Sequence, residues 1–188
     1  DTGSLNTKVV IDDGPSIHNW IGTTGDDIDR SSALAIDQAL EKAGLDRKRQ
    51  RYIVATGIGA RPNGLIDEKK SVTTCLGRGI NRLFPSVRMV VDLGAETCTV
   101  VKVNERGRVS DWGNQDKCAS GTGMFIQDMA RLMQMSFEQM SRLSLSAKEA
   151  AEITNTCAVF AESEVISRIH RDPPTPREDV VAGIFASA

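Results

Sequence analysis

Apolar residues in this chain occur in two patterns, short continuous runs and repeats at helical spacing. Short runs bounded by turn residues predict strands at 9–11, 51–59 (ending in a glycine-rich turn), 87–93, 97–103 and 108–112. Amphipathic spacing predicts helices at 29–43, 72–84, 124–135, 136–146, 146–153, 157–169 and from 177 onward. Since strands alternate with helices, the sequence predicts an α/β protein.

The turn residues support these boundaries. Gly44 is expected to end the first helix, and Pro85 to stop the second. Between 87 and 112, the turns GAE and NERG separate three apolar runs, which is typical of a meander of hairpins.

Composition and charge narrow the function classes. The chain has 188 residues, of which 40% are hydrophobic and 26% charged, with a net charge of -2. This balance is typical of one compact domain or two small lobes, and its slight acidity gives no sign of nucleic-acid binding. No apolar run approaches the roughly 20 residues of a membrane span, and no leader indicates export. The four cysteines show no CxxC spacing, so we expect a cytoplasmic protein without a disulfide framework.

Three turns that follow or precede strands are rich in small residues: DTGS at 1–4, ATGIG at 55–59 and DLGA at 92–95. Glycine lets a backbone approach a phosphate closely, and consecutive N–H groups can then point at the anion. An aspartate beside a phosphate requires a Mg²⁺ ion between them. Asp1 and Asp92 therefore suggest two loops around a metal–nucleotide, whereas the alternative is that each turn is merely tight.

Cys118 and Cys157 each precede a predicted helix. A helix N-terminus stabilises a thiolate, and its N–H groups can bond to the sulfurs of an iron–sulfur cluster. Two cysteines per chain would suffice if two chains shared one cluster across a two-fold axis. The alternative is that both are small packing residues, which is also how we interpret Cys75 and Cys98.

The flanks of these two cysteines resemble a known family. DKCASGTG at 116–123 and TCAVFAESEVIS at 156–167 resemble the ATP-hydrolysing activators of 2-hydroxyacyl-CoA dehydratases and the ATPase subunits of ATP-dependent benzoyl-CoA reductase. The resemblance extends over most of the chain, since further matches are DTGSLNTK, ATGIG, VVDLGAE and REDVVAGI.

The resemblance implies an actin-like, sugar-kinase-like ATPase fold with two ribonuclease-H-like lobes. We expect the first lobe at 1–112, and a cluster-helix region with part of the second lobe at 113–188. No strand precedes Asp1, and the family's glycine-rich adenosine loop does not follow Ala188. The resemblance therefore predicts truncation at both ends.

The resemblance also implies a function and its partners. A [4Fe-4S] cluster would be shared by two subunits, alike or unlike, with Cys118 and Cys157 as the metal ligands from each. ATP and Mg²⁺ would drive a low-potential electron from a donor such as ferredoxin or flavodoxin to a catalytic dehydratase or reductase component. That component would act on a CoA thioester, with no membrane or nucleic acid involved.

The remaining site residues are assigned by their place in the matching motifs. Asp92 and Glu96 are the catalytic candidates. The nucleotide-binding candidates are Asp1, Gly3, Ser4, Lys8, Gly94, Ala95, Gly121, Thr122 and Glu162. The family usually has G-G-Q-D where this chain has Gly94–Thr97, which leaves hydrolysis at that loop open.

Two other functions remain open at this point. One is a kinase or ATPase of the same fold that carries no cluster. The other is a degenerate nucleotide-binding subunit that serves only as a scaffold for a catalytic partner, which the altered loop makes credible.

Overall fold

The structure is a computed structural model that describes residues 1–49, 52–61, 64–115 and 122–188. Helices and strands are mixed along the chain, as the alternating pattern predicts. Two compact units are formed, which we call unit 1 (residues 1–90 with 100–112) and unit 2 (residues 91–99 with 113–188).

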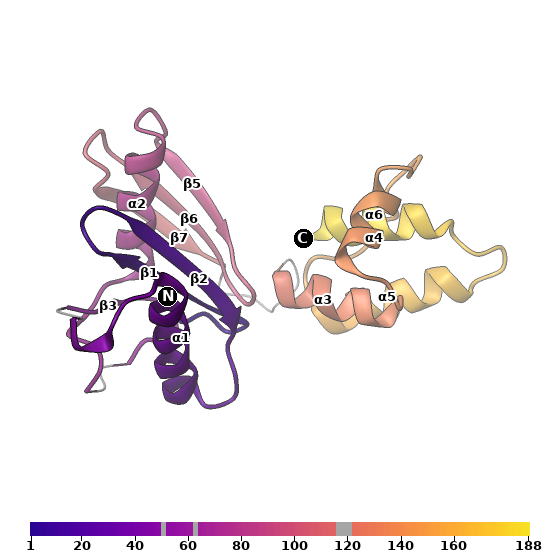
Figure 1. Ribbon diagram of the computed structural model, residues 1–188. Coiled ribbons are helices and arrows are strands. Elements are labelled where there is room, and N and C mark those ends of the chain that lie inside the picture. Colours follow the sequence, from indigo (N-terminus) through magenta and orange to yellow (C-terminus); the bar gives the residue numbers. More distant parts are fainter. Residues whose placement is uncertain (50–51, 62–63, 116–121) are drawn as a thin grey trace. The chain divides into compact units, whose positions relative to one another are not determined.

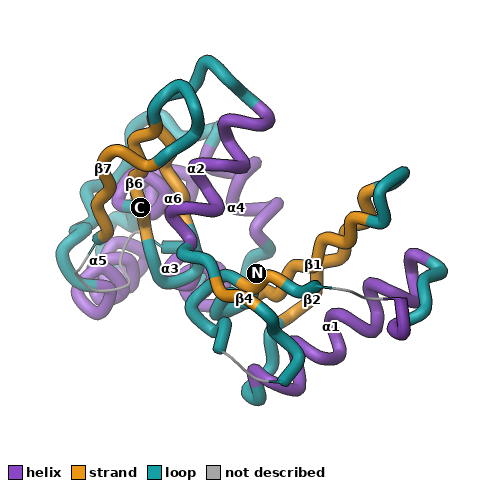
Figure 2. Tube along the Cα trace, turned by 90° about the vertical axis from the view of Figure 1, so that its left-hand side faces the viewer, coloured by secondary structure: helices purple, strands orange, loops and turns teal. Residues whose placement is uncertain are grey.

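Unit 1 begins with an antiparallel hairpin of β1 (Asn6–Asp12) and β2 (Ile17–Thr23). The turn between them is closed by aspartate side chains: Asp12 Oδ1 accepts from Gly14 N (2.9 Å) and Asp13 Oδ1 from Ser16 N (2.7 Å). Both strands pack against α1 (Ile28–Ala43), which runs beside them in Figure 2. The apolar run 9–11 predicts only the middle of β1, and β2 was not predicted.

The first helix follows its sequence signals closely. Asp27 caps α1 by accepting from Arg30 N at 3.0 Å, and Gly44 ends it in the left-handed conformation with φ of 68°. Ala35, Ala39 and Leu40 are buried. The predicted boundary at Gly44 is confirmed.

The middle of unit 1 contains less strand than expected. Within the described part of the predicted strand at 51–59, strand structure is limited to β3 (Val54–Ala55). This strand pairs in parallel with β4 (Glu68–Lys69). Next comes α2 (Val72–Leu83), capped by Ser71 and ending just before Pro85, as predicted.

The meander predicted at 87–112 is confirmed as a three-stranded sheet in the order β5 (Met89–Leu93), β6 (Cys98–Val103), β7 (Val109–Asn114). The β6–β7 turn contains Gly107 at a φ of 67°. An added Cβ there would lie 2.6 Å from Asn81 Cβ, so both the conformation and the close approach of α2 require glycine.

The rest of unit 2 is helical, with α3 (Gly123–Leu132), α4 (Phe137–Ser144), α5 (Ala158–His170) and α6 (Arg177–Ser187) (Figure 1). All four contribute to one apolar cluster: Phe125, Met129, Ala130, Met133, Met140, Ala161, Val165, Val180, Val181 and Ile184. Met129, Met133 and Met140 are among its largest fully buried side chains.

The helix predicted at 146–153 is wrong, because these residues have no helical structure. Their backbone groups bond to α6 instead. Asp179 Oδ1 accepts from Lys148 N at 2.9 Å, and its carbonyl accepts from Ala151 N at 2.9 Å. Contacts with α6 thus override a local helical pattern.

Candidate functional site

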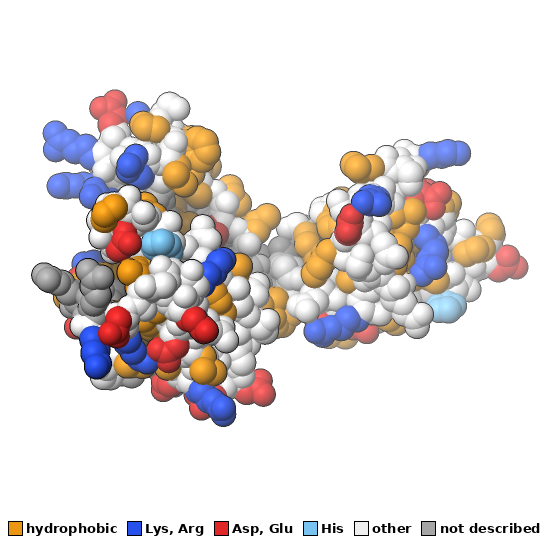
Figure 3. Space-filling model, in the orientation of Figure 1, with side chains coloured by type: hydrophobic (Ala, Val, Ile, Leu, Met, Phe, Trp, Pro, Cys, Tyr) orange, Lys and Arg blue, Asp and Glu red, His pale blue; other side chains and the backbone are white. Residues whose placement is uncertain are grey.

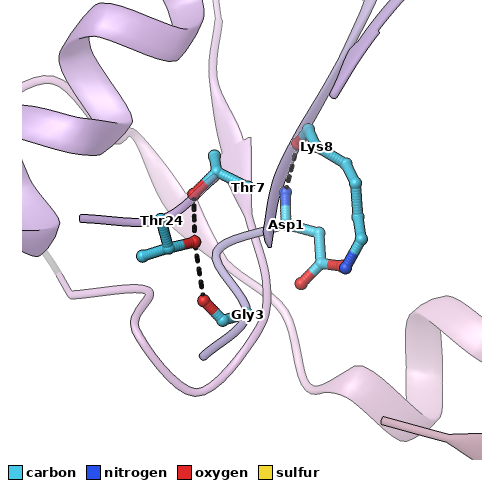
Figure 4. Close-up of polar contacts among 5 residues, drawn as sticks. All are labelled: Asp1, Gly3, Thr7, Lys8 and Thr24. Carbon is cyan, nitrogen blue, oxygen red and sulfur yellow. Dashed lines mark hydrogen bonds and ion pairs between the residues drawn. The ribbon is translucent and has the colours of Figure 1, made fainter. Parts of the chain in front are cut away.

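The loop at residues 1–8, which we call the first loop, folds back onto itself in unit 1. Gly3 N donates to Asn6 O at 3.1 Å, and Lys8 N donates to Asp1 O at 2.8 Å. The Lys8 side chain also returns to Asp1, where Nζ lies 3.0 Å from the carboxylate (Figure 4). Three predicted residues, Asp1, Gly3 and Lys8, are thus brought together.

A partly buried pair of hydroxyls, those of Thr7 and Thr24, braces this loop. Thr24 Oγ1 donates to Gly3 O at 2.8 Å and lies 2.8 Å from Thr7 Oγ1 (Figure 4). Thr7 is only 3% exposed, so its hydroxyl depends on this partner. Thr24 was not recognised from the sequence, because it lies 21 residues from Gly3 and belongs to no motif.

The turn at residues 55–60, which we call the glycine turn, packs directly against the first loop. Thr2 N donates to Thr56 O at 2.9 Å, and Gly59 N donates to Thr2 O at 3.0 Å. Gly57 has a φ of 95°, and an added Cβ would lie 2.4 Å from Thr2 O. Two turns that the sequence presents separately therefore form one structure.

The second loop, residues 92–97 in unit 2, begins at the end of β5. Asp92 is half-buried, and within the described ranges no residue forms a hydrogen bond or ion pair with its carboxylate. Gly94 N donates to Thr97 O at 2.7 Å, which closes a tight turn, and Glu96 is exposed beside it. An available carboxylate at a strand end is suited to a hydrated Mg²⁺ ion.

The carbonyls of the second loop contact the start of α3. Gly123 N donates to Gly94 O at 2.9 Å, and Met124 N donates to Ala95 O at 2.8 Å. Thr122, the N-cap of α3, is 2% exposed. The predicted residues Gly94, Ala95 and Thr122 thus lie together, whereas the predicted residues Cys118 and Gly121 lie outside the described residues.

Cys157 is the N-cap of α5, as its flanking sequence predicts. It is half-buried, it forms no disulfide, and its side chain makes no capping hydrogen bond. Val159 and Phe160, in the first turn of the helix, are 66% and 65% exposed. An available thiol therefore lies at a helix N-terminus beside an apolar surface, which is a setting that favours a metal-bound thiolate.

The other candidates lie in simpler surroundings. Glu162 is exposed on α5, and Glu164 Oε2 accepts from Thr154 N at 2.7 Å, which holds the segment leading to Cys157. Ser4 is half-buried in the first loop. Cys75 and Cys98 are half-buried in α2 and β6. No three His, Cys, Asp or Glu residues cluster around a possible metal position in the described part of the chain.

An α/β chain with two D-x-G loops and helices on its second half is typical of the actin-like ATPases. Residues 1–187 match the model of the BadF/BadG/BcrA/BcrD ATPase family, so the chain belongs to that ATPase family. No described helix is both long enough and apolar enough to cross a membrane.

Similar proteins agree with this assignment. The activator of lactoyl-CoA dehydratase from Anaerotignum propionicum is 33% identical over this whole chain, which covers 72% of that protein. One of the subunits of benzoyl-CoA reductase from Thauera aromatica is 29% identical over 99% of the chain, which covers 66% of that protein. The solved activator of the 2-hydroxyisocaproyl-CoA dehydratase from Clostridium difficile, with bound ADPNP, is 32% identical. The two structures superpose with a TM-score of 0.87, and the match covers 98% of this chain and 69% of that one. The predicted actin-like fold is confirmed.

Proposed function

We propose that this chain is a subunit that uses ATP to deliver a low-potential electron to an enzyme acting on a CoA thioester. Membership of the ATPase family supports the use of ATP. The names of its relatives, a dehydratase activator and a component of a reductase, support a catalytic partner that handles CoA thioesters.

The observation that carries the proposal is the environment of Cys157. Its thiol caps α5 without a capping hydrogen bond, and Val159 and Phe160 expose large apolar surface in the following turn. Apolar side chains also reach the surface elsewhere on unit 2 (Figure 3). An exposed apolar pair of this kind favours contact with another protein, so a second subunit covering it would enclose the thiol.

A [4Fe-4S] cluster fits these residues, with Cys118 and Cys157 of each of two subunits as its four ligands. Such a cluster would supply one-electron chemistry at low potential. The residues of this chain contribute the thiolates, the positive end of the α5 dipole and an apolar surface that excludes water. The second subunit is either a copy of this chain or an unlike chain. The difference affects only how its apolar surface matches the one beside Cys157.

Both loops are proposed to bind ATP with Mg²⁺. In the first loop, Lys8 and Asp1 neutralise one another at 3.0 Å, and Lys8 would exchange the carboxylate for a phosphate oxygen. In the second, Asp92 would hold Mg²⁺ through water, and Glu96 would orient the attacking water. Ser4, Gly121 and Glu162 complete the proposed nucleotide contacts, and a ferredoxin or flavodoxin is the proposed electron donor.

The cysteine assignment is tested by three single variants of the anaerobically iron-reconstituted protein. We expect Cys157→Ala to lose the cluster absorbance and the EPR signal of the reduced state, because a dimer of this chain then lacks two of the four proposed ligands. ADPNP affinity should be unchanged, because neither loop contains Cys157. Cys75→Ala and Cys98→Ala are the matched controls, and both should retain the cluster.

Cluster loss in either control would show that the wrong thiols were chosen. A wild-type protein that binds ADPNP but never assembles a cluster would support the cluster-free ATPase or kinase instead. A scaffold role is favoured by one specific observation, the replacement of the usual loop residues by Ala95, Glu96 and Thr97. Absence of ATP turnover in a cluster-containing protein would establish that role.

A further inference from the structure

A cavity in unit 2 is lined by α5 and by the segment at residues 152–154. Its volume is about 530 Å³, which falls within the range of roughly 300–1,000 Å³ that is typical of small-molecule sites. From α5 and its C-cap come Glu164, Ser167, Arg168 and Arg171, whose spacing of three and four residues places them on one side of the helix. None of these residues belongs to the two loops proposed to bind ATP.

The two arginines of this cavity have no carboxylate partner. Glu164 precedes Arg168 by four residues, which is the spacing and order that favour an ion pair on a helix. Glu164 Oε2 instead accepts from Thr154 N at 2.7 Å, which holds its carboxylate at the preceding segment. Within the described ranges, no carboxylate oxygen lies within 4.0 Å of a guanidinium nitrogen of Arg168 or Arg171. Both guanidinium groups are therefore available to a ligand.

A phosphate group is the ligand that fits two such side chains. A guanidinium presents its N–H donors in a planar fork, which matches the oxygens of a phosphate or a carboxylate. A phosphate monoester carries about −1.5 to −2 charges at pH 7, so that it compensates both arginines, whereas one carboxylate compensates only one. The hydroxyl of Ser167, which lines the cavity beside them, is a further donor to a phosphate oxygen.

The cavity also contains a group that opposes an anion. Glu152 lines it, is exposed, and forms no ion pair with any described residue. A carboxylate beside a phosphate weakens its binding by repulsion between like charges. We propose that this cavity binds the phosphate group of a small metabolite, with Arg168 and Arg171 as the residues that hold it and Glu152 as a residue that limits its affinity.

The site is tested by amide NMR of the intact protein at constant ionic strength. Mg²⁺ and ADPNP are present at saturation, so that the proposed nucleotide loops are occupied, and inorganic phosphate is the first probe. We expect saturable shifts at the amides of Thr154 and Ser167. Arg168→Gln and Arg171→Gln should each weaken phosphate binding by about tenfold, because each removes a charge-assisted hydrogen bond. Glu152→Gln should strengthen it.

Arg131→Gln is the matched control. Arg131 also lies on a helix of unit 2, but it is paired with Asp128 at 3.1 Å and does not line the cavity. This variant should bind phosphate as the wild type does.

Two further probes identify the source of the phosphate group. Tighter binding of glycerol 3-phosphate than of inorganic phosphate would identify a phosphate ester as the ligand, and equal binding would identify free phosphate. Glycerate has a similar body but carries a carboxylate in place of the phosphate. Binding of glycerate as tight as that of glycerol 3-phosphate would overturn the assignment to phosphate.

The site itself is rejected by either of two results. Shifts confined to Gly3 or Gly94 would show that phosphate binds at the nucleotide loops, and unchanged affinity in both arginine variants would remove the arginines from the site. If Arg168→Gln does not fold, Arg171→Gln decides, because the Arg171 side chain is exposed. A failure of ADPNP to bind would reject the proposed nucleotide site alone, since the shift at Ser167 is read independently of both loops.

Discussion

The first and second loops have the same D-x-G sequence pattern, but they are held in different ways. The first loop is braced by its own unit, through Thr7, Thr24 and the glycine turn. Its aspartate is paired with Lys8. The second loop is closed by the turn hydrogen bond from Gly94 N to Thr97 O, and the carbonyls of Gly94 and Ala95 accept from α3.

The difference indicates that the two loops have different roles. A loop whose polar groups already have partners within the protein forms a preorganised site that changes little when a ligand binds. The second loop instead presents the Asp92 carboxylate, which no described residue contacts through a hydrogen bond or ion pair, to the proposed Mg²⁺ ion. We therefore expect substitutions in the first loop to affect mainly binding and stability, and those in the second to affect mainly turnover.

The largest expected effect is that of Gly57→Ala, which should destabilise the first loop. Alanine at positive φ costs about 1–2 kcal/mol, and forcing a methyl against packed atoms costs about 1–3 kcal/mol more. Here the added Cβ would lie 2.4 Å from Thr2 O and 2.5 Å from Asp1 Oδ1. Urea unfolding should show a loss of about 3 kcal/mol, with ADPNP affinity reduced as well.

Gly14→Ala separates the cost of the positive φ from the cost of the steric overlap. Gly14 has the same φ of 95°, but an added Cβ would meet nothing within 4 Å. It should therefore lose only the conformational part, about 1–2 kcal/mol, and retain ADPNP affinity. Equal losses in the two variants would show that the glycine turn does not brace the first loop.

Next in size is Asp92→Ala, which tests the second loop. The Asp92 carboxylate has no partner within the described ranges, so removing it should leave the free energy of unfolding nearly unchanged. If it positions Mg²⁺, ATP turnover should fall about 100-fold, which corresponds to about 2.7 kcal/mol. Steady-state phosphate release measures this. Turnover equal to that of the wild type would remove Asp92 from the site.

The sequence predicts those parts of the fold that are specified locally. The meander β5–β7 is bounded by its own turn residues, and α1 carries its own cap and terminal glycine. β2 was missed because its exposed face carries the apolar Ile17 and Ile21, at 72% and 65% exposure, so burial does not follow the usual pattern. β4 consists of two charged residues, Glu68 and Lys69, which resemble loop.

The candidate site likewise contains some features that the local sequence predicts and others that depend on tertiary contacts. Cys157 could be placed at a helix N-terminus from its flanks alone, since the helical pattern follows it directly. The contacts of Thr24 and Gly57 could not be predicted, because each lies against a backbone group at least 21 residues away. Only tertiary structure reveals such contacts. The same limit explains the wrong helix at 146–153, whose partners lie in α6.

The smallest predicted effect is that of removing the Thr24 hydroxyl from the first loop. Thr24→Val keeps the side-chain shape but removes the hydroxyl that donates to Gly3 O and contacts Thr7 Oγ1. Leaving a buried polar group without a partner costs about 1–3 kcal/mol, so we expect urea unfolding to show a loss of about 1 kcal/mol. Calorimetry should show weaker ADPNP binding, because Gly3 is no longer held.

Thr23→Val is the matched control, because Thr23 is the exposed neighbour at the end of β2 and valine suits a strand. It should change neither quantity. Thr24→Ser should restore most of the loss, since the hydroxyl returns. Thr24→Val should weaken nucleotide binding yet leave ATP turnover unchanged once ATP is saturating, because Thr24 contacts the first loop. Reduced turnover at saturating ATP would show that the two loops do not have separate roles.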